Sequence, residues 1–246
     1  LNDYTLLSGY DEYKIEVTNP CGEFGGNAYN SCNLMSLNLY SFIEDKFGDV
    51  PHLAEEEFRA AVRTAVRALD EVLDYGFDTQ PLEENRQCIR DWRSVGLGLF
   101  GVADAFVAMK LAYGSRESCD FIQGVLRTMF TEAARTSAAL AKEKGVFGKY
   151  DWEKTKKSPL IQRLAEEEPE VYAEVLAEIK EYGLRNGTLL SIAPTGTISL
   201  LMGVFSGGCE PLYQISYERT THKMEEKSGS FRVYAHSVSD LLDYHK

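Results

Sequence analysis

Long helical segments that alternate with short, widely spaced apolar segments constrain the fold of this chain most strongly. From Glu55 to about Tyr75, apolar side chains recur at helical spacing, which predicts a long amphipathic helix. Residues 187–193 form a short, continuous apolar run instead, which is typical of a buried strand. Because such helices lie between single strands, we expect an α/β fold in a single domain over residues 1–246.

Five further segments extend this pattern. Residues 12–18 and 32–43 alternate polar and apolar side chains and predict strands. Residues 96–109, 115–144 and 160–182 predict helices. The first of these helices opens with the run Gly96-Leu-Gly-Leu-Phe-Gly101, which has the GxGxxG spacing of a dinucleotide site but no predicted strand before it. We therefore interpret its small residues as a surface for close helix packing.

The charge of the chain limits its partners. A net charge of −12 over 246 residues argues against binding to nucleic acid or to an anionic membrane surface. A phosphorylated substrate would need a dedicated local site. The chain has no apolar run near the ~18 residues of a membrane span and no signal-peptide pattern, so we expect a cytoplasmic protein without a membrane partner. It starts at Leu1, close to a motif, so we expect a segment of a longer polypeptide.

The cysteine and histidine patterns exclude the common metal and disulfide frameworks. Five cysteines without a CxxC pair fit neither a secreted disulfide scaffold nor a structural zinc site. Four scattered histidines show no HxxxH or HExxH spacing. We expect no metal held by side chains of this chain.

The motif Asn19-Pro20-Cys21-Gly22-Glu23, called here the 19–23 loop, carries the first candidate chemistry. In an extended segment, alternate side chains point to the same side, so its amide, thiol and carboxylate would converge on one small volume. Pro20 favours an extended Asn19, and Gly22 allows close approach to the backbone. The alternative is a loop with a buried, inert cysteine, which is the more common case for a lone cysteine.

A second motif, Pro194-Thr195-Gly196-Thr197-Ile198-Ser199, follows the apolar run and is called here the 194–199 loop. If a helix begins here, its first amide groups lack internal partners and can bind a phosphate, with hydroxyl groups as further donors. An ordinary helix cap built from Thr and Ser explains the same residues equally well. A P-loop is excluded because its lysine is absent. Together the two loops indicate cysteine chemistry on a phosphorylated metabolite, and spacing alone leaves the reaction open.

These motifs, in their order along the chain, resemble the catalytic barrel of the ribonucleotide reductase large chain, and most closely its class II, adenosylcobalamin-dependent branch. The matching stretches are Thr18-Asn-Pro-Cys-Gly-Glu23, Ser31-Cys-Asn-Leu-Met-Ser-Leu-Asn-Leu39, Val95-Gly-Leu-Gly-Leu-Phe-Gly-Val-Ala-Asp104, Ala139-Leu-Ala-Lys-Glu-Lys-Gly145, Arg185-Asn-Gly-Thr-Leu-Leu-Ser-Ile-Ala-Pro-Thr-Gly-Thr-Ile-Ser199 and Gly208-Cys-Glu-Pro211. The resemblance implies the second half-barrel of a ten-stranded α/β barrel with a central loop that carries a thiyl cysteine.

The resemblance also implies roles for the candidate residues. Cys21 would become the thiyl radical that abstracts the 3′-hydrogen, Glu23 would take the proton of the 3′-hydroxyl, and Asn19 would hydrogen-bond the sugar hydroxyls. Cys32 would be one of two cysteines that reduce the substrate radical and end as a disulfide. The 194–199 loop would bind the phosphates, through Pro194, Thr195, Gly196, Thr197, Ile198 and Ser199.

The implied partners include parts of the enzyme outside this chain. They are a ribonucleoside di- or triphosphate, a thioredoxin-type reductant and the remainder of the reductase polypeptide, which holds the second reducing cysteine and most of the adenosylcobalamin site. In isolation we expect the chain to be inactive. Two alternatives remain: a class I large chain, whose radical comes from a separate subunit, and a nucleotide-binding module in which Cys21 is only structural.

Overall fold

The computed structural model describes residues 5–221 and 229–246. The chain divides into two compact units: unit 1 comprises Leu1–Leu37, Glu56–Gly98 and Gln123–Ala193, and unit 2 comprises Asn38–Glu55, Leu99–Ile122 and Pro194–Lys246. The single-domain organisation stays a prediction.

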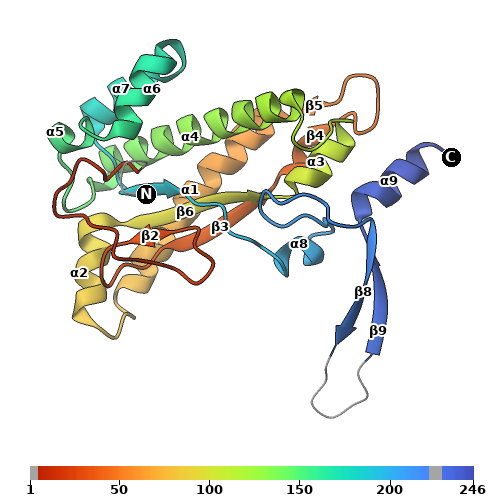
Figure 1. Cartoon of the computed structure of the whole chain (residues 1–246). Helices are drawn as coiled ribbons and strands as arrows, with labels where there is room; N and C mark the ends of the chain where they lie inside the picture. The colour runs from red at the N-terminus through yellow and green to blue at the C-terminus, as the bar shows by residue number, and fades with distance from the viewer. Residues whose placement is uncertain (1–4, 222–228) are drawn as a thin grey trace. The chain divides into compact units, whose positions relative to one another are not determined.

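Figure 1 shows how helices and strands follow one another along the chain and labels them where there is room. The helices are α1 (Glu55–Phe77), α2 (Glu83–Trp92), α3 (Val102–Ala108), α4 (Arg116–Lys144), α5 (Trp152–Thr155), α6 (Pro159–Glu167), α7 (Pro169–Tyr182), α8 (Ile198–Leu201) and α9 (His236–Tyr244), with a 3-10 turn at Leu39–Phe42. The strands are β1 (Val17–Thr18), β2 (Gly25–Gly26), β3 (Asn33–Asn38), β4 (Ile43–Glu44), β5 (His52–Leu53), β6 (Ser94–Phe100), β7 (Thr188–Leu190), β8 (Ser216–Thr221) and β9 (Gly229–Tyr234).

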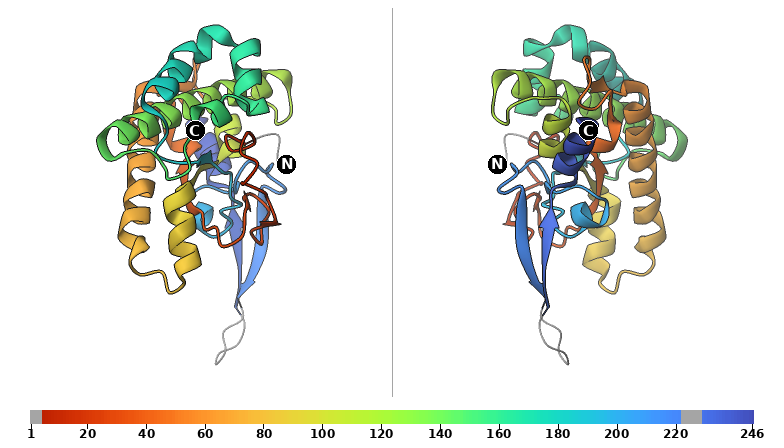
Figure 2. Two further views of the ribbon diagram at one scale, coloured as in Figure 1. Left: turned by 90° about the vertical axis from the view of Figure 1, so that its left-hand side faces the viewer. Right: turned by 90° about the vertical axis from the view of Figure 1, so that its right-hand side faces the viewer.

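The core of unit 1 forms around a sheet with the strand order β3-β6-β7. Every residue of β6 is buried, and β6 runs parallel to β7, with Ser94 opposite Thr188 and Leu97 opposite Leu190. Helices α1 and α2 lie side by side and are joined at one end by a short loop (Figure 2). The apolar side chains that predicted an amphipathic α1 are buried in the structure, at Phe58, Val62, Ala65, Val66, Leu69 and Leu73.

A buried ion pair in unit 1 holds the N-terminal ends of β6 and β7 against α1. Asp70, fully buried on α1, accepts hydrogen bonds from the guanidinium of Arg93 at 2.6 Å and from the side-chain amide of Asn186 at 3.0 Å. Arg93 immediately precedes β6, and Asn186 lies just before β7. Because breaking a buried pair leaves an uncompensated charge, this contact ties both strands firmly to α1.

The structure corrects the prediction of a helix over residues 96–109. Gly96 and Gly98 lie on β6, and the helix, α3, begins only at Val102. A Cβ atom on Gly98 would lie 2.3 Å from the carbonyl oxygen of Ser191, and one on Gly96 would lie 2.9 Å from the sulfur of Cys32. The glycines therefore allow close approach of Ser191, directly after β7, and of Cys32, directly before β3, and not of a helix.

Unit 2 combines α3, α8 and α9 with two hairpins. Strand β4 pairs with β5, and β8 pairs with β9, both antiparallel. The hydroxyl of Tyr40, in the 3-10 turn, donates a hydrogen bond to Asp240 of α9 at 2.6 Å. This contact joins the start of unit 2 to its last helix.

The other predicted elements are confirmed in type but differ at their ends. The helices over 55–75 and 115–144 correspond to α1 and α4. The helix over 160–182 is two helices, because Pro169 begins α7 and cannot continue α6. The strand over 187–193 is β7, the strand over 32–43 is β3 followed by the 3-10 turn, and the strand over 12–18 is shortened to β1, Val17–Thr18.

Candidate active site

The 19–23 loop is the tip of a hairpin in unit 1. Strands β1 and β2 pair antiparallel, with Thr18 opposite Gly25. The backbone N–H of Asn19 donates to the carbonyl oxygen of Phe24 at 3.1 Å, and its side-chain carbonyl accepts from the N–H of Phe24 at 3.1 Å. Asn19 therefore closes the hairpin with its backbone and its side-chain oxygen. Within residues 5–221 and 229–246, no hydrogen bond to its side-chain NH₂ group is found.

Within this hairpin the loop is a tight turn, so the prediction of an extended segment is wrong. The N–H of Gly22 donates to the carbonyl of Asn19 at 3.0 Å, which places Pro20 and Cys21 at the two central positions of a β-turn. Gly22 has a φ of +82°, in the left-handed region that favours glycine. The turn leaves Cys21 exposed at the tip, which contradicts the alternative of a buried cysteine.

Glu23 lies at the base of the turn in a different environment. Its backbone carbonyl accepts a hydrogen bond from the hydroxyl of Ser191 at 3.0 Å. Its carboxylate oxygen Oε2 is buried and has no hydrogen-bond partner among the described residues. Buried polar atoms are nearly always paired in native proteins, so an unpaired carboxylate oxygen is a candidate for contact with a ligand.

Cys32 lies directly before β3, half-buried, where its sulfur faces Gly96 of β6. Burial raises the pKa of its thiol to about 12, and the negative charge of Glu23 contributes in the same direction. The Cys32 thiol therefore keeps its hydrogen at neutral pH and lies within electrostatic range of the Glu23 carboxylate.

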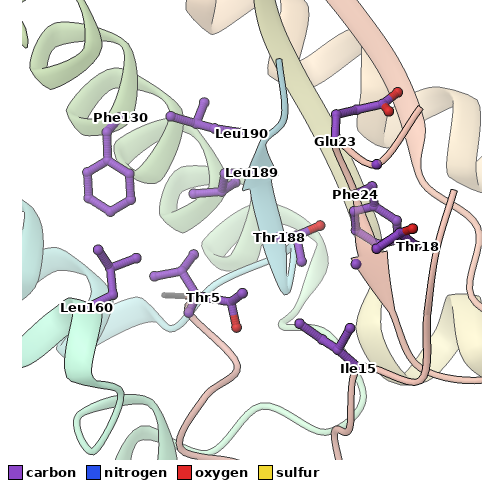
Figure 3. A pocket seen from close by; sticks show the side chains of 13 residues that line it. Thr5, Ile15, Thr18, Glu23, Phe24, Phe130, Leu160, Thr188, Leu189 and Leu190 are labelled. Atoms are coloured by element: carbon purple, nitrogen blue, oxygen red, sulfur yellow. The ribbon is translucent and has the colours of Figure 1, made fainter. Parts of the chain in front are cut away.

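Two cavities of unit 1 adjoin the hairpin. The larger, about 390 Å³, is lined by Gly22, Glu23 and Phe24 on one side and by Phe130 and Leu160 on the other. Figure 3 shows β7 side chains between these two sides and the Glu23 carboxylate pointing away from Phe130 and Leu160. The smaller cavity, about 210 Å³, is lined by Asn19 and Cys32 among others. The structure thus brings Asn19, Glu23 and Cys32 together around the base of the hairpin, and Cys21 stands at its tip.

The 194–199 loop belongs to unit 2 and has a fixed backbone. Thr195 has a φ of +51°, which is unusual for a β-branched residue. Its hydroxyl oxygen accepts a hydrogen bond from the N–H of Gly208 at 3.0 Å, and its carbonyl accepts one from the N–H of Ser199 at 2.9 Å. Ser199 is buried, whereas Gly196, Thr197 and Ile198 are exposed.

The helix expected after this loop is α8, which is only four residues long. A helix dipole needs several aligned peptide units, so the dipole argument for phosphate binding does not apply to α8. What remains are the exposed Thr197 and the open space at Gly196, where an added Cβ atom would meet nothing within 4 Å.

Sequence reasoning missed Ser191, whose hydroxyl holds the backbone of Glu23. The available signal was a serine in the middle of the mostly apolar run of residues 187–193. Among residues 5–221 and 229–246, no group of three or more Asp, Glu, His and Cys side chains could hold a metal ion. Within the same ranges, no helix has both the length and the apolar character that a membrane crossing requires.

Comparison with known proteins identifies the family. Residues 2–244 match the model of the family described as "Ribonucleotide reductase, barrel domain". The chain belongs to this family. The mixed helix-and-strand architecture agrees with part of such a barrel, and the predicted resemblance is confirmed.

Curated relatives of the reductase chain carry two kinds of name. The vitamin B12-dependent ribonucleoside-diphosphate reductase of Thermoplasma acidophilum is 33% identical over 237 residues, which cover 91% of this chain and 27% of the relative. The Mycobacterium tuberculosis protein of the same name is 33% identical over 206 residues, 84% of this chain and 25% of the relative. The ribonucleoside-diphosphate reductase subunit alpha of Chlamydia pneumoniae is 31% identical over 238 residues, 89% of this chain and 22% of the relative. The chain thus spans about a quarter of the length of these relatives.

Proposed function

We propose that this chain forms part of the catalytic barrel of an adenosylcobalamin-dependent ribonucleotide reductase, which reduces ribonucleotides to the 2′-deoxyribonucleotides needed for DNA synthesis in the cytoplasm. One observation carries the proposal. An exposed thiol, Cys21, stands at the tip of a rigid turn, two residues from a carboxylate whose Oε2 atom is buried and unpaired within the described part of the chain.

Each of the three hairpin residues has its own role in the first half of the reaction. Cys21, as a thiyl radical, takes the hydrogen atom from C3′ of the ribose. Glu23 accepts the proton of the 3′-hydroxyl as a general base, and one proton passes to the 2′-hydroxyl, which leaves as water, so that the proton count balances. The NH₂ group of Asn19, whose carbonyl oxygen is used by Phe24, donates to a sugar hydroxyl and orients the ring.

Cys32 serves the second half. Its thiol and that of a second cysteine, outside this chain, supply two electrons and two hydrogens to the substrate radical and become a disulfide. Cys21 then returns its hydrogen atom to C3′. A neutral thiol is required for this step, and the raised pKa of Cys32 keeps it protonated. A thioredoxin-type reductant restores the thiols.

The 194–199 loop binds the phosphates of a ribonucleoside di- or triphosphate. Its exposed Thr197 hydroxyl and the open backbone at Gly196 are the groups that can contact an anion there. Since the chain has a net charge of −12, such a local site has to overcome general repulsion of the substrate.

The residues of this chain fit the cofactor only at the thiol itself. Cys21 is exposed and the space at Gly22 is open, so a radical-generating group can reach the sulfur. As the family resemblance implies, other parts of the enzyme hold most of the adenosylcobalamin. When bound, the cofactor supplies the radical, and the protein supplies position and proton transfer.

The test replaces Cys21 by alanine in the full-length reductase. We expect loss of deoxynucleotide formation and loss of isotope exchange at the 3′-carbon, because no other group would form the thiyl radical. Cys119→Ala, which removes another exposed cysteine, is the matched control and should retain activity. Measurable deoxynucleotide formation by the Cys21→Ala enzyme would overturn the proposal.

A class I large chain is the second candidate, favoured by relatives named as alpha subunits. In that case the radical comes from a separate subunit. Activity that requires added adenosylcobalamin, and that needs no second subunit, distinguishes class II from class I.

A further inference from the structure

A fully buried carboxylate in unit 2 has no role in the chemistry above. Asp104, on α3, is 0% exposed. Its Oδ2 atom accepts hydrogen bonds from the N–H of Phe205 at 3.1 Å, and from the N–H and the hydroxyl of Ser206, both at 2.8 Å. Its Oδ1 atom accepts from the hydroxyl of Ser237 at 2.5 Å. All these donors are neutral, and burial of a carboxylate is tolerable only when its oxygens are hydrogen-bonded in this way.

The two oxygens of Asp104 hold different parts of the unit. Oδ1 contacts α9 through Ser237, whereas Oδ2 holds the backbone of residues 205–206. The carbonyl of Ser206 also accepts from the N–H of Gly101, directly before α3, at 3.0 Å. Residues 205–206 therefore donate hydrogen bonds to α3 and accept one from the residue directly before it.

The segment held by Asp104 lies along the 194–199 loop. The N–H of Val204 donates to the carbonyl of Ser199 at 3.0 Å. A Cβ atom on Gly207 would lie 2.2 Å from the carbonyl oxygen of Pro194, so these backbones are in direct contact. The N–H of Gly208 donates to the hydroxyl of Thr195 at 3.0 Å. Residues on both sides of the Asp104 contact thus hold the two ends of the loop.

Thr195 shows why the loop needs this support. Its φ of +51° is an unfavourable conformation that persists only where the surroundings enforce it. The hydrogen bond from Gly208 is one such contact, and Gly208 is two residues from Ser206. If residues 205–206 shift, Gly208 shifts with them, and Thr195 can relax.

We propose that Asp104 is a positioning residue for phosphate binding: through residues 205–208 it holds the 194–199 loop in the shape that receives the phosphates. This inference rests on the proposed function of that loop. Asp104 does not touch the substrate. It acts through the backbone that its Oδ2 atom fixes.

The test is Asp104→Asn in the full-length reductase. Asparagine has the same shape but no charge, and hydrogen bonds to a charged acceptor are about twice as strong as neutral ones. We expect KM for the ribonucleotide to rise about tenfold with kcat nearly unchanged, as for the loss of one such bond. Binding of the unphosphorylated ribonucleoside should not change, and a general loss of stability would not produce that selectivity.

Ser237→Ala is the matched control, because it removes the donor to Oδ1 and leaves the Oδ2 contacts in place. It should lower Tm but leave KM within about twofold, well under the size of one charge-assisted bond. If Asp104→Asn does not fold, Ser206→Ala removes one Oδ2 donor and should raise KM about threefold, the effect of a weaker bond. An unchanged KM in the folded Asp104→Asn enzyme, or in Ser206→Ala where Asp104→Asn fails to fold, would overturn the inference.

Thr197→Val separates this inference from the proposed function. It removes an exposed hydroxyl of the 194–199 loop itself. If Thr197→Val raises KM and Asp104→Asn does not, the loop binds phosphate and Asp104 does not position it. If both variants leave KM unchanged, the phosphate site itself is wrong, and the inference falls with it.

Discussion

The 19–23 loop and the 194–199 loop each contain one proline and one glycine, yet different contacts hold them in shape. The 19–23 loop closes on itself, through the hydrogen bonds between Asn19 and Phe24 and between Gly22 and Asn19. The 194–199 loop is held by a neighbouring segment, which is fixed in turn by the buried Asp104. A local turn thus carries the candidate thiol, and a long-range network shapes the candidate phosphate site.

The difference has a physical consequence. A turn closed by its own backbone and by a glycine at positive φ keeps its shape when distant residues change. A loop shaped by distant contacts can be altered from several places, because each contact in the series is needed. We therefore expect substitutions at several distant positions to affect the 194–199 loop. The 19–23 loop should respond mainly to changes within itself and at Ser191, whose hydroxyl binds the carbonyl of Glu23.

The largest effect is expected for Gly207→Ala. The added Cβ atom would lie 2.2 Å from the carbonyl oxygen of Pro194, and the next residues along the two backbones, Thr195 and Gly208, are joined by a hydrogen bond. We expect a loss of about 3 kcal/mol in unfolding free energy, the upper range for overpacking, together with weaker nucleotide binding. Chemical denaturation and KM of the full-length enzyme measure the two effects.

Gly196→Ala is the control for this prediction. An added Cβ atom there meets nothing within 4 Å, so stability should hardly change. Equal losses of unfolding free energy in Gly207→Ala and Gly196→Ala would show that the contact between Gly207 and Pro194 does not shape the loop.

A smaller effect is expected at Asn19, where two variants separate the turn from the chemistry. Asn19→Ala removes the acceptor for the N–H of Phe24 and should cost about 1 kcal/mol of stability. Asn19→Asp keeps that acceptor, so the hairpin should keep its stability, but it loses the NH₂ group proposed to bind the sugar. The two measurements should therefore respond differently. Asn19→Asp should unfold at the same temperature as the parent enzyme and still show a lower kcat/KM. If Asn19→Asp keeps full activity, Asn19 acts only on the turn.

The same contrast explains what could be predicted from the sequence. The helices α1 and α4 were predictable because their apolar periodicity lies within the element itself. The residues of the 19–23 loop were predictable as a motif, but their extended geometry was not, because the turn depends on the pairing of β1 with β2. Asn19 and Phe24 are only five positions apart, a separation that is compatible with a hairpin loop.

Long-range contacts account for what the sequence did not indicate. The glycines of β6 fit the backbone of Ser191, and Asp104 binds Ser206 across 102 positions of the chain. No local sequence pattern indicates such pairs, because the sequence around each residue gives no sign of its distant partner. The short α8 is a further example, since the apolar residues after Thr197 were compatible with a longer helix.

The smallest effect concerns the pKa of Cys32, which tests whether the two candidate groups in unit 1 act on each other. Burial raises this pKa to about 12, and the charge of Glu23 adds to the shift. Because a negative neighbour disfavours the thiolate, Glu23→Gln should lower the pKa of Cys32, while burial keeps it above its ordinary value. The pH dependence of alkylation at Cys32, followed by mass spectrometry, should move to lower pH. Cys88 is the internal control, because burial raises its pKa to about 11 and Glu23 is not among the causes. A curve for Cys32 that does not move, or one that moves together with that of Cys88, would mean that Glu23 and Cys32 do not interact electrostatically.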